Sequence, residues 1–518
     1  MLKIREVKTG SGKTAVQVYY LYNRKRIIVK HIGSAMTKED LIHLKQQARQ
    51  FIEDYSGQVS LFPIMKPGSY SYLEQYECVG FYYRFFYKVI RQLIAQIGIE
   101  ELTSELFKDL IVIRILEPAS KLRSIELIER YFGIQHRRQN YYKEAKKWIA
   151  LKSQIIEKVN DFAQKEYGYD YTLVFYDVTT LYFETFEDDH WRKTGFSKDN
   201  KSQQPQILVG LLVSKEGFPL AFDLFPGNTF EGHTLLPIVK AFIQKKQVKH
   251  FTIVADAAMI SAQNIQELKK EGIHYIVGAR LGNLPQTLFE ELDAKIKRED
   301  GNIVRLHTDK GYLICSFSIA RHKKDKYELE KQILKAESII KRPSKNIKAK
   351  FVKVNNQKLE LNEELINKST RLLGLKGYYT DLPEEDLASN KVIERYHDLY
   401  KVEQAFRVAK SDLETRPIFH YKEEPIKLHL LICFLALVIS KHIEIKTGLS
   451  LKRFITEAKK IADARMLNKL TDKEIIVKGK LTQTAEELLL KLNLLCLSPL
   501  IRWTKINKLV LYSKLVRV

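Results

Sequence analysis

Apolar and polar residues alternate along the first part of the chain and then recur at helical spacing. The runs KIREVK, AVQVYYLY and RIIVKHI alternate as β-strands do, which predicts a three-stranded unit. Residues 37–55 follow with helical periodicity, and Glu39 and Asp40 occupy the first turn, where acids favour the helix dipole. We therefore expect residues 1–65 to form a small β-hairpin unit plus a helix.

Residues 70–168 show apolar positions three and four residues apart, which predicts a helical region. One segment of it resembles a helix–turn–helix and interleaves cations with Tyr141, Tyr142 and Trp148. Two interpretations fit this segment equally well. It is either a DNA-docking face, with cations placed for phosphates, or an ordinary bundle with a solvated basic face. The candidate DNA-binding residues here are Lys121, Arg123, Arg137 and Arg138.

Near residue 169 the pattern changes to mixed strands and helices. Strands are predicted at 172–178, 206–214, 218–224, 250–255 and 273–278, with helices at 233–246 and 261–271. Three strands in a meander, followed by alternating helix and strand, is the order of a ribonuclease-H-like α/β fold. We expect residues 169–279 and 386–447 to form this domain, 280–385 to be an insertion before its last helix, and 448–518 to be helical.

Composition adds a possible partner. Lys plus Arg is 86 and Asp plus Glu is 62, so the net charge is +24, which favours a polyanionic partner such as nucleic acid. A lysine-rich soluble surface would explain only several units of that charge. The apolar run 428–440 is too short to span a membrane and predicts a buried helix. The cysteines, Cys78, Cys315, Cys433 and Cys496, match no zinc or disulfide spacing, so we expect core residues and a reducing cytoplasm.

Three carboxylates occupy marked settings. Asp177 ends an apolar run in TLVFYDVTTLYF, Asp256 ends another in FTIVADAAMIS, and Glu403 lies in a basic helical stretch. Carboxylates at the ends of buried strands are suited to bind hard cations, and two Mg²⁺ (or Mn²⁺) ions about 3.5–4 Å apart can catalyse phosphodiester chemistry. Asp177, Asp256 and Glu403 are therefore the candidate catalytic and metal-binding residues. Asp223 is the most credible alternative to Asp256.

The predicted helix 390–411 places further candidates beside Glu403. Tyr396, Glu403 and Lys410 are spaced seven residues apart, nearly two helical turns, and would share one face. Arg407 lies one turn beyond Glu403. Tyr396, Arg407 and Lys410 are therefore candidate DNA-binding residues, although simple charge pairing on a solvated helix would produce the same pattern.

Three blocks of the chain resemble the catalytic blocks of bacterial insertion-sequence DDE transposases. They are FYDVTTLYFE, IVADAAMIS and YHDLYKVEQAFRVAKSDLETRPIFH. The last resembles the YREK signature of that group, with Tyr396, Glu403 and Lys410 at its spacings and Leu399 at the position of its arginine. Arg407 or Lys401 could supply the missing charge.

The resemblance implies a ribonuclease-H-like transposase that cleaves the ends of an insertion sequence and joins them to target DNA. It implies a partner of double-stranded DNA, namely terminal inverted repeats and target, a homodimer in the synaptic complex, no membrane, and a prokaryotic, nucleoid-associated location in the cytoplasm. Two alternatives remain at this point: a ribonuclease-H-like nuclease or resolvase without strand transfer, and a catalytically inactive DNA-binding derivative.

Overall fold

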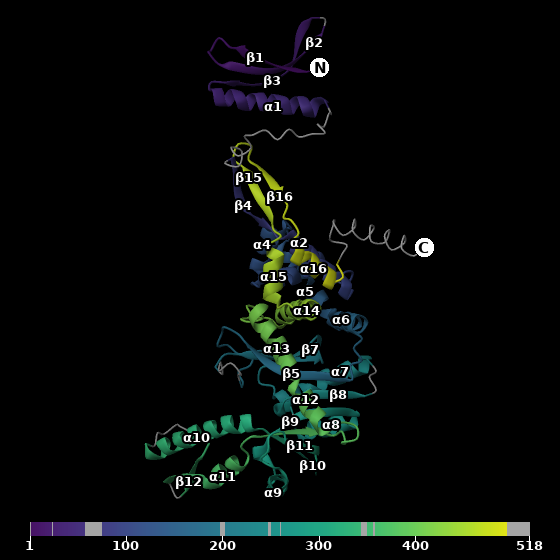
Figure 1. Ribbon diagram of the computed structural model, residues 1–518, viewed down its shortest axis with the longest axis vertical. Helices are drawn as coiled ribbons and strands as arrows, with labels where there is room; N and C mark the ends of the chain where they lie inside the picture. Colours follow the sequence, from purple (N-terminus) through teal and green to yellow (C-terminus); the bar gives the residue numbers. More distant parts are fainter. Residues whose placement is uncertain are drawn as a thin grey trace, which may run out of the picture. The chain divides into compact units, whose positions relative to one another are not determined.

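The computed structural model describes residues 2–22, 24–56, 75–196, 203–246, 250–259, 261–342, 350–355 and 358–494 (Figure 1). These residues fall into two compact units. One lies within Met1–Glu77 and Asn468–Lys473, and the other within Cys78–Leu467 and Glu474–Val518.

The first unit is a three-stranded antiparallel sheet with one helix. Its elements are β1 (Lys3–Lys8), β2 (Thr14–Tyr22), β3 (Lys25–Ala35) and α1 (Lys38–Ser56), and the strands are in the order β1-β2-β3. Val16, Val18 and Ala48 form its core. Alternation in β2 directs the two valines to the face on which α1 packs, so the strands and helix predicted from the sequence are confirmed.

The second unit contains a helical part built from both ends of its chain. Its elements are β4 (Tyr76–Tyr82), α2 (Arg84–Ile97), α3 (Glu105–Leu116), α4 (Lys121–Phe132), α5 (Arg138–Ala150), α6 (Lys152–Tyr167), α14 (Glu423–Thr447), α15 (Leu451–Lys459), β15 (Asp463–Asn468), β16 (Lys473–Val477) and α16 (Gln483–Lys491). β16, β15 and β4 form a sheet in that order, so the C-terminal region that we expected to be helical also contains strands.

Two helices, α3 and α14, form the centre of this part and pack against each other. Among the described residues, α14 alone has the length and apolar composition of a membrane-spanning helix, but 89% of its apolar window is buried inside the protein. It is the buried helix predicted over 428–440. Cys315 and Cys433 are buried as expected, whereas Cys78 is exposed on β4 and Cys496 lies outside the described residues.

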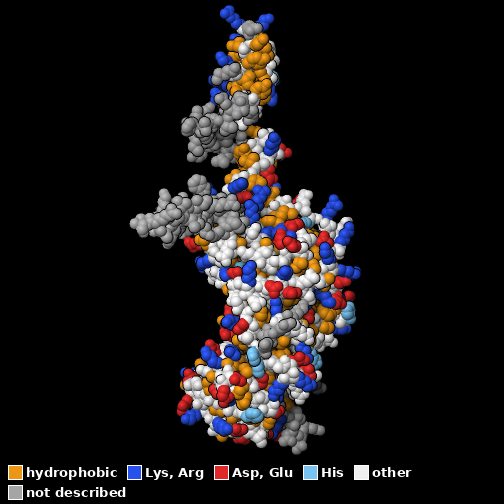
Figure 2. Space-filling model, turned by 90° about the vertical axis from the view of Figure 1, so that its right-hand side faces the viewer, with side chains coloured by type: hydrophobic (Ala, Val, Ile, Leu, Met, Phe, Trp, Pro, Cys, Tyr) orange, Lys and Arg blue, Asp and Glu red, His pale blue; other side chains and the backbone are white. Residues whose placement is uncertain are grey.

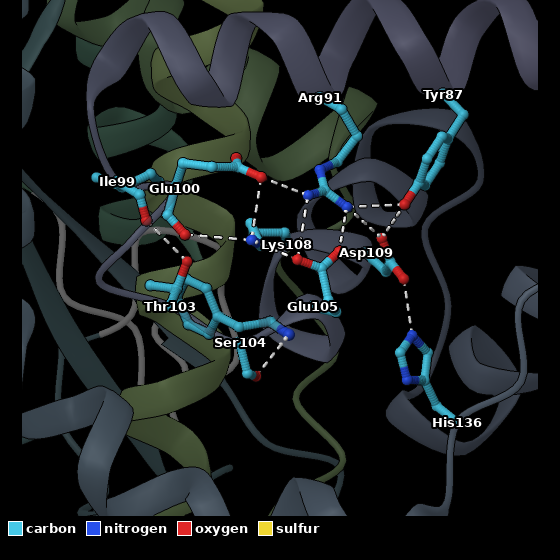
Figure 3. A network of polar contacts seen from close by, with 11 residues as sticks. Tyr87, Arg91, Ile99, Glu100, Thr103, Ser104, Glu105, Lys108, Asp109 and His136 are labelled. Carbon is cyan, nitrogen blue, oxygen red and sulfur yellow. Dashed lines mark hydrogen bonds and ion pairs between the residues drawn. The ribbon is translucent and has the colours of Figure 1, made fainter.

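A polar network joins α2 to α3 (Figure 3). Asp109 is 1% exposed and accepts hydrogen bonds from Tyr87 Oη at 2.7 Å and Arg91 Nη1 at 3.3 Å. Its other oxygen lies 2.7 Å from Nε2 of His136, and Arg91 also pairs with Glu105 at 2.7 Å. A buried carboxylate is tolerated only when its oxygens are satisfied in this way, so the network fixes the two helices relative to each other.

The rest of the second unit is organised around an eight-stranded mixed sheet. Its strands, in spatial order, are β10 (Ile303–Thr308), β11 (Gly311–Phe317), β14 (Leu375–Thr380), β9 (Ile273–Ala279), β8 (Phe251–Ala255), β5 (Leu173–Tyr182), β6 (Gln206–Ser214) and β7 (Pro219–Pro226). β5, β6 and β7 are antiparallel neighbours, β8 and β9 run parallel to β5, and β14 is antiparallel to β9. β6, β7, β8 and β9 agree closely with the predicted strands, and β5 begins close to its predicted start but continues beyond its predicted end.

The predicted insertion contributes to this sheet and also forms a lobe. β10, β11 and β14 extend the sheet beyond β9. The other elements are α9 (Gln286–Lys295), α10 (Ile319–Lys341), β12 (Val352–Asn355), β13 (Lys358–Leu361) and α11 (Glu363–Arg371). Leu329, Ala336, Phe351 and Leu373 form a small separate core there. Residues 280–385 are thus partly continuous with the sheet on which the candidate acids lie.

Helices pack on the sheet at several places. They are α7 (Leu235–Lys246), α8 (Ala262–Lys270), α12 (Ser389–His397) and α13 (Tyr400–Arg407). α7 contacts β6 and β7, α12 contacts β8, β9 and β14, and α13 contacts β5 and β6. The two helices that replace the predicted helix 390–411 therefore cross the middle of the sheet, over the strands that carry the aspartates.

Candidate active site

Asp177 lies on β5, and Asp256 directly follows the neighbouring parallel strand β8 at the matching position. Tyr176 on β5 is in register with Ala255 on β8, and each aspartate is the next residue along its chain. Because side chains alternate along a strand, both aspartates belong to the face opposite Tyr176. Asp177 is half-buried and Asp256 is exposed. The structure thus places these two predicted acids next to each other.

The prediction that Asp177 ends its strand is wrong. β5 continues to Tyr182 because β6 still pairs with it after β8 has ended at Ala255. Asp177 itself is in register with Leu211 of β6, so its backbone remains within the sheet. The aspartate marks the point at which β5 loses its parallel neighbour, not the point at which β5 ends.

The sheet face that carries Asp177 is covered by α13 and the turn that follows it. Leu211 and Phe222 are in register with Asp177 across β6 and β7. These two residues line a cavity together with Phe406 of α13 and with Lys410. Glu403 is on the same helix as Phe406, so the third predicted acid approaches the aspartates from this side of the sheet.

Asp223, the alternative acid, lies on the other face. It is in register with Gly210 of β6, which is in register with Val178, the neighbour of Asp177 in the chain. Alternation therefore assigns Asp223 and Asp177 to opposite faces of the sheet. The Asp223 carboxylate also forms an ion pair with Lys152 of α6 at 2.7 Å. Asp223 is consequently excluded from a site built around Asp177.

Tyr396 bonds directly to one of the acids. Its hydroxyl donates a hydrogen bond to Oδ1 of Asp256 at 3.4 Å, and the backbone N–H of Ala257 donates to the same oxygen at 2.6 Å. Burial, and then the negative charges of Asp256 and Glu403, raise the pKa of Tyr396 above its ordinary value. Gly278 on β9 makes room for the ring, because a Cβ there would lie 2.6 Å from the tyrosine oxygen. Tyr396, expected to bind DNA, is therefore a buried partner of Asp256.

Lys376 is a cation of this site that the sequence did not indicate. It belongs to β14, and its Nζ lies 4.9 Å from the centre of the Tyr396 ring. Burial and then Arg321 lower the pKa of Lys376, while Asp256 and Glu403 act in the opposite direction. Both acids are thus close enough to act on the Lys376 amine. No motif surrounds Lys376, and only the pairing of β14 with β9 brings it to the acids.

The helix expected to continue over 390–411 is interrupted twice. Between α12 and α13 the N–H of Leu399 bonds to the carbonyl of Tyr396, three residues back. After α13 a π-helical turn covers Val408–Asp412, and the N–H of Leu413 bonds to Val408, five residues back. These turns wind more tightly and more loosely than an α-helix, so the seven-residue spacing alone does not establish a shared face here.

Leu399, which stands where the signature has arginine, is part of the hydrophobic core at 7% exposure. Lys401, one suggested replacement, forms an ion pair with Asp398 at 3.1 Å. Arg407, the other, is exposed. Asp256 and Glu403 both act on the pKa of Lys376, so β14 brings a positive charge close to Glu403.

The three acids do not form a closed metal-binding cage. No group of three or more His, Cys, Asp or Glu side chains within the described ranges is arranged to hold a metal ion. Nearby carboxylates repel one another, so a tight cluster is not expected without a cation. The donor chemistry nevertheless fits: the candidates are carboxylate oxygens, the ligands that Mg²⁺ and Mn²⁺ prefer, and two of the three are exposed.

The basic residues of the helical part separate into exposed and buried sets. Arg123, Arg137 and Arg138 are exposed, as a docking face requires. Lys121 is not on that face: it is 6% exposed, and its Nζ lies 3.0 Å from Nδ1 of His429. Tyr141 and Trp148 are also buried, while Tyr142 is exposed. Only part of the predicted basic and aromatic surface is therefore available to a partner.

Comparison with known proteins gives a family for this chain. The sequence matches the family model described as "Transposase DDE domain" over residues 168–439, more than half of the chain, and that range includes Asp177, Asp256 and Glu403. A solved structure of a piggyBac transposase synaptic complex with hairpin DNA is similar to 73% of this chain and 70% of its own, with 11% sequence identity. The TM-score of 0.34 is too low to establish a common fold. No curated protein matches the sequence.

Proposed function

The chain belongs to the transposase DDE domain family, and from this premise we propose that it cleaves the ends of an insertion sequence and joins them to target DNA. One observation carries the proposal. Asp177 and Asp256 share one sheet face at matching positions, on β5 and directly after the adjacent parallel strand β8, inside the range that matches the family. The spatial order β7-β6-β5-β8-β9 supports a ribonuclease-H-like core for this chemistry.

Asp177, Asp256 and Glu403 would hold two Mg²⁺ or Mn²⁺ ions. Bound there, such ions supply an activated water at neutral pH and stabilise the departing oxygen of the phosphodiester. Tyr396 orients the Asp256 carboxylate through its hydrogen bond. Lys376 places positive charge beside the acids, where the phosphate of the substrate would lie.

The partner in this proposal is double-stranded DNA, both the terminal inverted repeats and the target. The net charge of +24 and the exposed Arg123, Arg137, Arg138 and Arg407 support it. Because two ends must be held together before joining, we propose a homodimer in the synaptic complex. A prokaryotic, nucleoid-associated location in the cytoplasm is part of the proposal, because the partner is DNA.

Substitution of each acid tests the catalytic assignment. We expect Asp177→Asn, Asp256→Asn and Glu403→Gln each to reduce cleavage at least about a hundredfold, because each removes a charged metal ligand. The measurement is Mg²⁺-dependent cleavage of a labelled duplex made from the DNA that flanks the gene. Binding of the same duplex by fluorescence anisotropy should change little.

Asp223→Asn is the matched control, because it makes the same chemical change on the opposite face of the same sheet. It should keep near wild-type cleavage. Equal loss of cleavage in Asp223→Asn, or wild-type cleavage in any variant of Asp177, Asp256 or Glu403, contradicts the catalytic assignment.

The reaction products distinguish a transposase from a nuclease that lacks strand transfer. Ends joined to target DNA indicate a transposase, whereas cleavage without joined products indicates a nuclease.

A further inference from the structure

A small cavity lies where the loop after α3, the first turn of α4, residues 414–420 and α14 meet. Its volume is about 100 Å³, roughly three times the share of one water in the liquid, which is room for a tetrahedral oxyanion. Its lining includes Arg114, Lys121, Arg416, His420 and His429. We infer that this cavity binds one phosphate group, held by the buried Arg114 and Lys121.

Arg114 presents an unused donor to this region. The residue is 3% exposed, and its Nη2 donates to the carbonyl of Ala119 at 2.6 Å. Among the described residues its Nε has no hydrogen-bond partner. A buried N–H without a partner is unfavourable, so an acceptor in the cavity would stabilise the protein. A guanidinium offers several donors in one plane, which suits a phosphate.

The hydrogen bonds of Lys121 and His429 identify which atoms in the cavity donate. His429 Nε2 lies 3.1 Å from the carbonyl of Thr415, which can only accept, so this nitrogen carries the proton. His429 Nδ1 therefore accepts from Lys121 Nζ at 3.0 Å. That contact uses one of the lysine donors and leaves others for a ligand.

The two buried cations of the cavity, Arg114 and Lys121, have no ion-pair partner in the described part of the chain, and the one carboxylate in the lining is the exposed Glu414. None of the ion pairs among the described residues includes Arg114 or Lys121, although most buried charges in proteins are paired. Burial and the charge of Arg114 lower the pKa of Lys121, and burial, with Lys121 and Arg114, lowers the pKa of His420 to about 4. An anion in the cavity would offset this repulsion between cations.

Two further features favour a phosphate that belongs to DNA. Lys121 is the first residue of α4, so the cavity lies at the positive end of a helix dipole. Arg416 lines the cavity, and its guanidinium lies 5.4 Å from the centre of the Tyr182 ring. Tyr182 is on β5, the strand that also carries Asp177. Half-buried Ser120 and exposed Phe419 form part of the rim. The assignment to DNA rests on the proposed function, whereas the phosphate site itself does not.

Inorganic phosphate provides the first test on the full-length protein. We expect phosphate, compared with chloride at equal ionic strength, to raise the Tm of the wild type. Lys121→Met should abolish that rise, and Ala119→Leu, which narrows the cavity without removing a charge, is the second variant in case the first fails to fold. Arg130→Met removes an exposed cation from the same helix that is not a candidate DNA contact, and it should keep the rise. No rise in the wild type, or an equal rise in all variants, overturns the site.

Duplex DNA provides the second test. Lys121→Met should flatten the plot of log affinity against log salt concentration by about 1, the loss of one phosphate contact. An unchanged slope together with a lost phosphate effect overturns the assignment to DNA and indicates free phosphate as the ligand. Neither of these tests measures cleavage. The phosphate site is therefore tested by Tm and by DNA affinity, whereas the transposase function is tested by cleavage and joining of DNA.

Discussion

At the scale of single residues, the contact between Tyr396 and Asp256 defines what the tyrosine can do. The pKa of Tyr396 is raised by burial and by the neighbouring acids, so the hydroxyl stays protonated across the neutral and alkaline range. It can donate a hydrogen bond to Asp256 but cannot act as a general base. Its role is therefore to hold the carboxylate in one orientation.

Tyr396→Phe tests that role. We expect cleavage to fall about tenfold, because one hydrogen bond to a charged group contributes about 1.5–3 kcal/mol and the ring still packs beneath Gly278. Anisotropy should show unchanged DNA affinity. The pH–rate profiles of both proteins should have the same shape up to pH 10, since the raised pKa keeps the tyrosine neutral there. An inflection found only in the wild type would show that the tyrosine titrates during catalysis.

Residues of this site differ in how readily the sequence reveals them. Asp177 and Asp256 can be found because each follows an apolar run, and the parallel pairing of those runs is a local consequence of the strand pattern. Lys376 cannot, because its proximity to Asp256 depends on β14 pairing with β9 across about a hundred residues of chain. The prediction that Lys121 is exposed and binds DNA is affected for a related reason. A lysine among other cations in the sequence is expected to be exposed, and Lys121 is buried only by tertiary packing.

At the scale of elements, the junction between α12 and α13 determines which type of residue the fold accepts at position 399, four residues before Glu403. Leu399 lies at this junction and is buried in the core. The tight turn at this junction keeps the Leu399 side chain inside the core and away from solvent. A buried position of this kind favours an apolar side chain over a charged one.

Restoring the arginine of the signature should therefore harm the protein. We expect Leu399→Arg to lower the free energy of unfolding by about 3 kcal/mol, because an unpaired charge would be buried. Denaturant titration measures this change, and Leu399→Met, which preserves volume and polarity, is the control. Greater cleavage with unchanged stability would show that the position can accept the signature residue.

The network between α2 and α3 predicts how the stability of the protein changes at acidic pH. The hydrogen bond from Arg91, and then Lys108, lower the pKa of Glu105 to about 2. A lowered carboxylate pKa stabilises the fold above the unfolded value near 4.5, and that contribution is lost as the pH falls toward 2. The free energy of unfolding should decline less steeply in Glu105→Gln than in the wild type between those values. Parallel declines would show that the network does not act through Glu105.

Elements within the chain were predictable where their pattern is local. The alternation in β2 and the apolar run of β8 predicted nearly the observed bounds of these strands, whereas the apolar run of β5 predicted only where that strand begins. The two interruptions around Glu403 were not predictable, because the sequence from Ser389 to Asp412 keeps the periodicity of one helix. The strands β10, β11 and β14 were expected to lie apart, since nothing within their own sequence indicates that they extend an existing sheet.

At the scale of the whole molecule, the net charge is +24. Lys and Arg side chains are scattered among acids over the visible face (Figure 2). Such a surface attracts DNA without selecting a sequence, so affinity should depend strongly on salt. We expect a linear decrease of log affinity with log salt concentration, with a slope of magnitude about 4 or more for a contact with several phosphates. A slope near zero would contradict binding along the DNA backbone.

The order of strands in the sheet has a consequence for synthesis of the protein. β9 receives β14 as its second neighbour only after residue 380 has been made, although β9 itself ends at Ala279. Until then its apolar run, IHYIVGA, presents an open edge with unpaired backbone groups, the arrangement that recruits strands from other chains. Truncated or slowly translated chains that stop between these points should aggregate, so complete synthesis through β14 protects the nascent protein before Glu403 arrives.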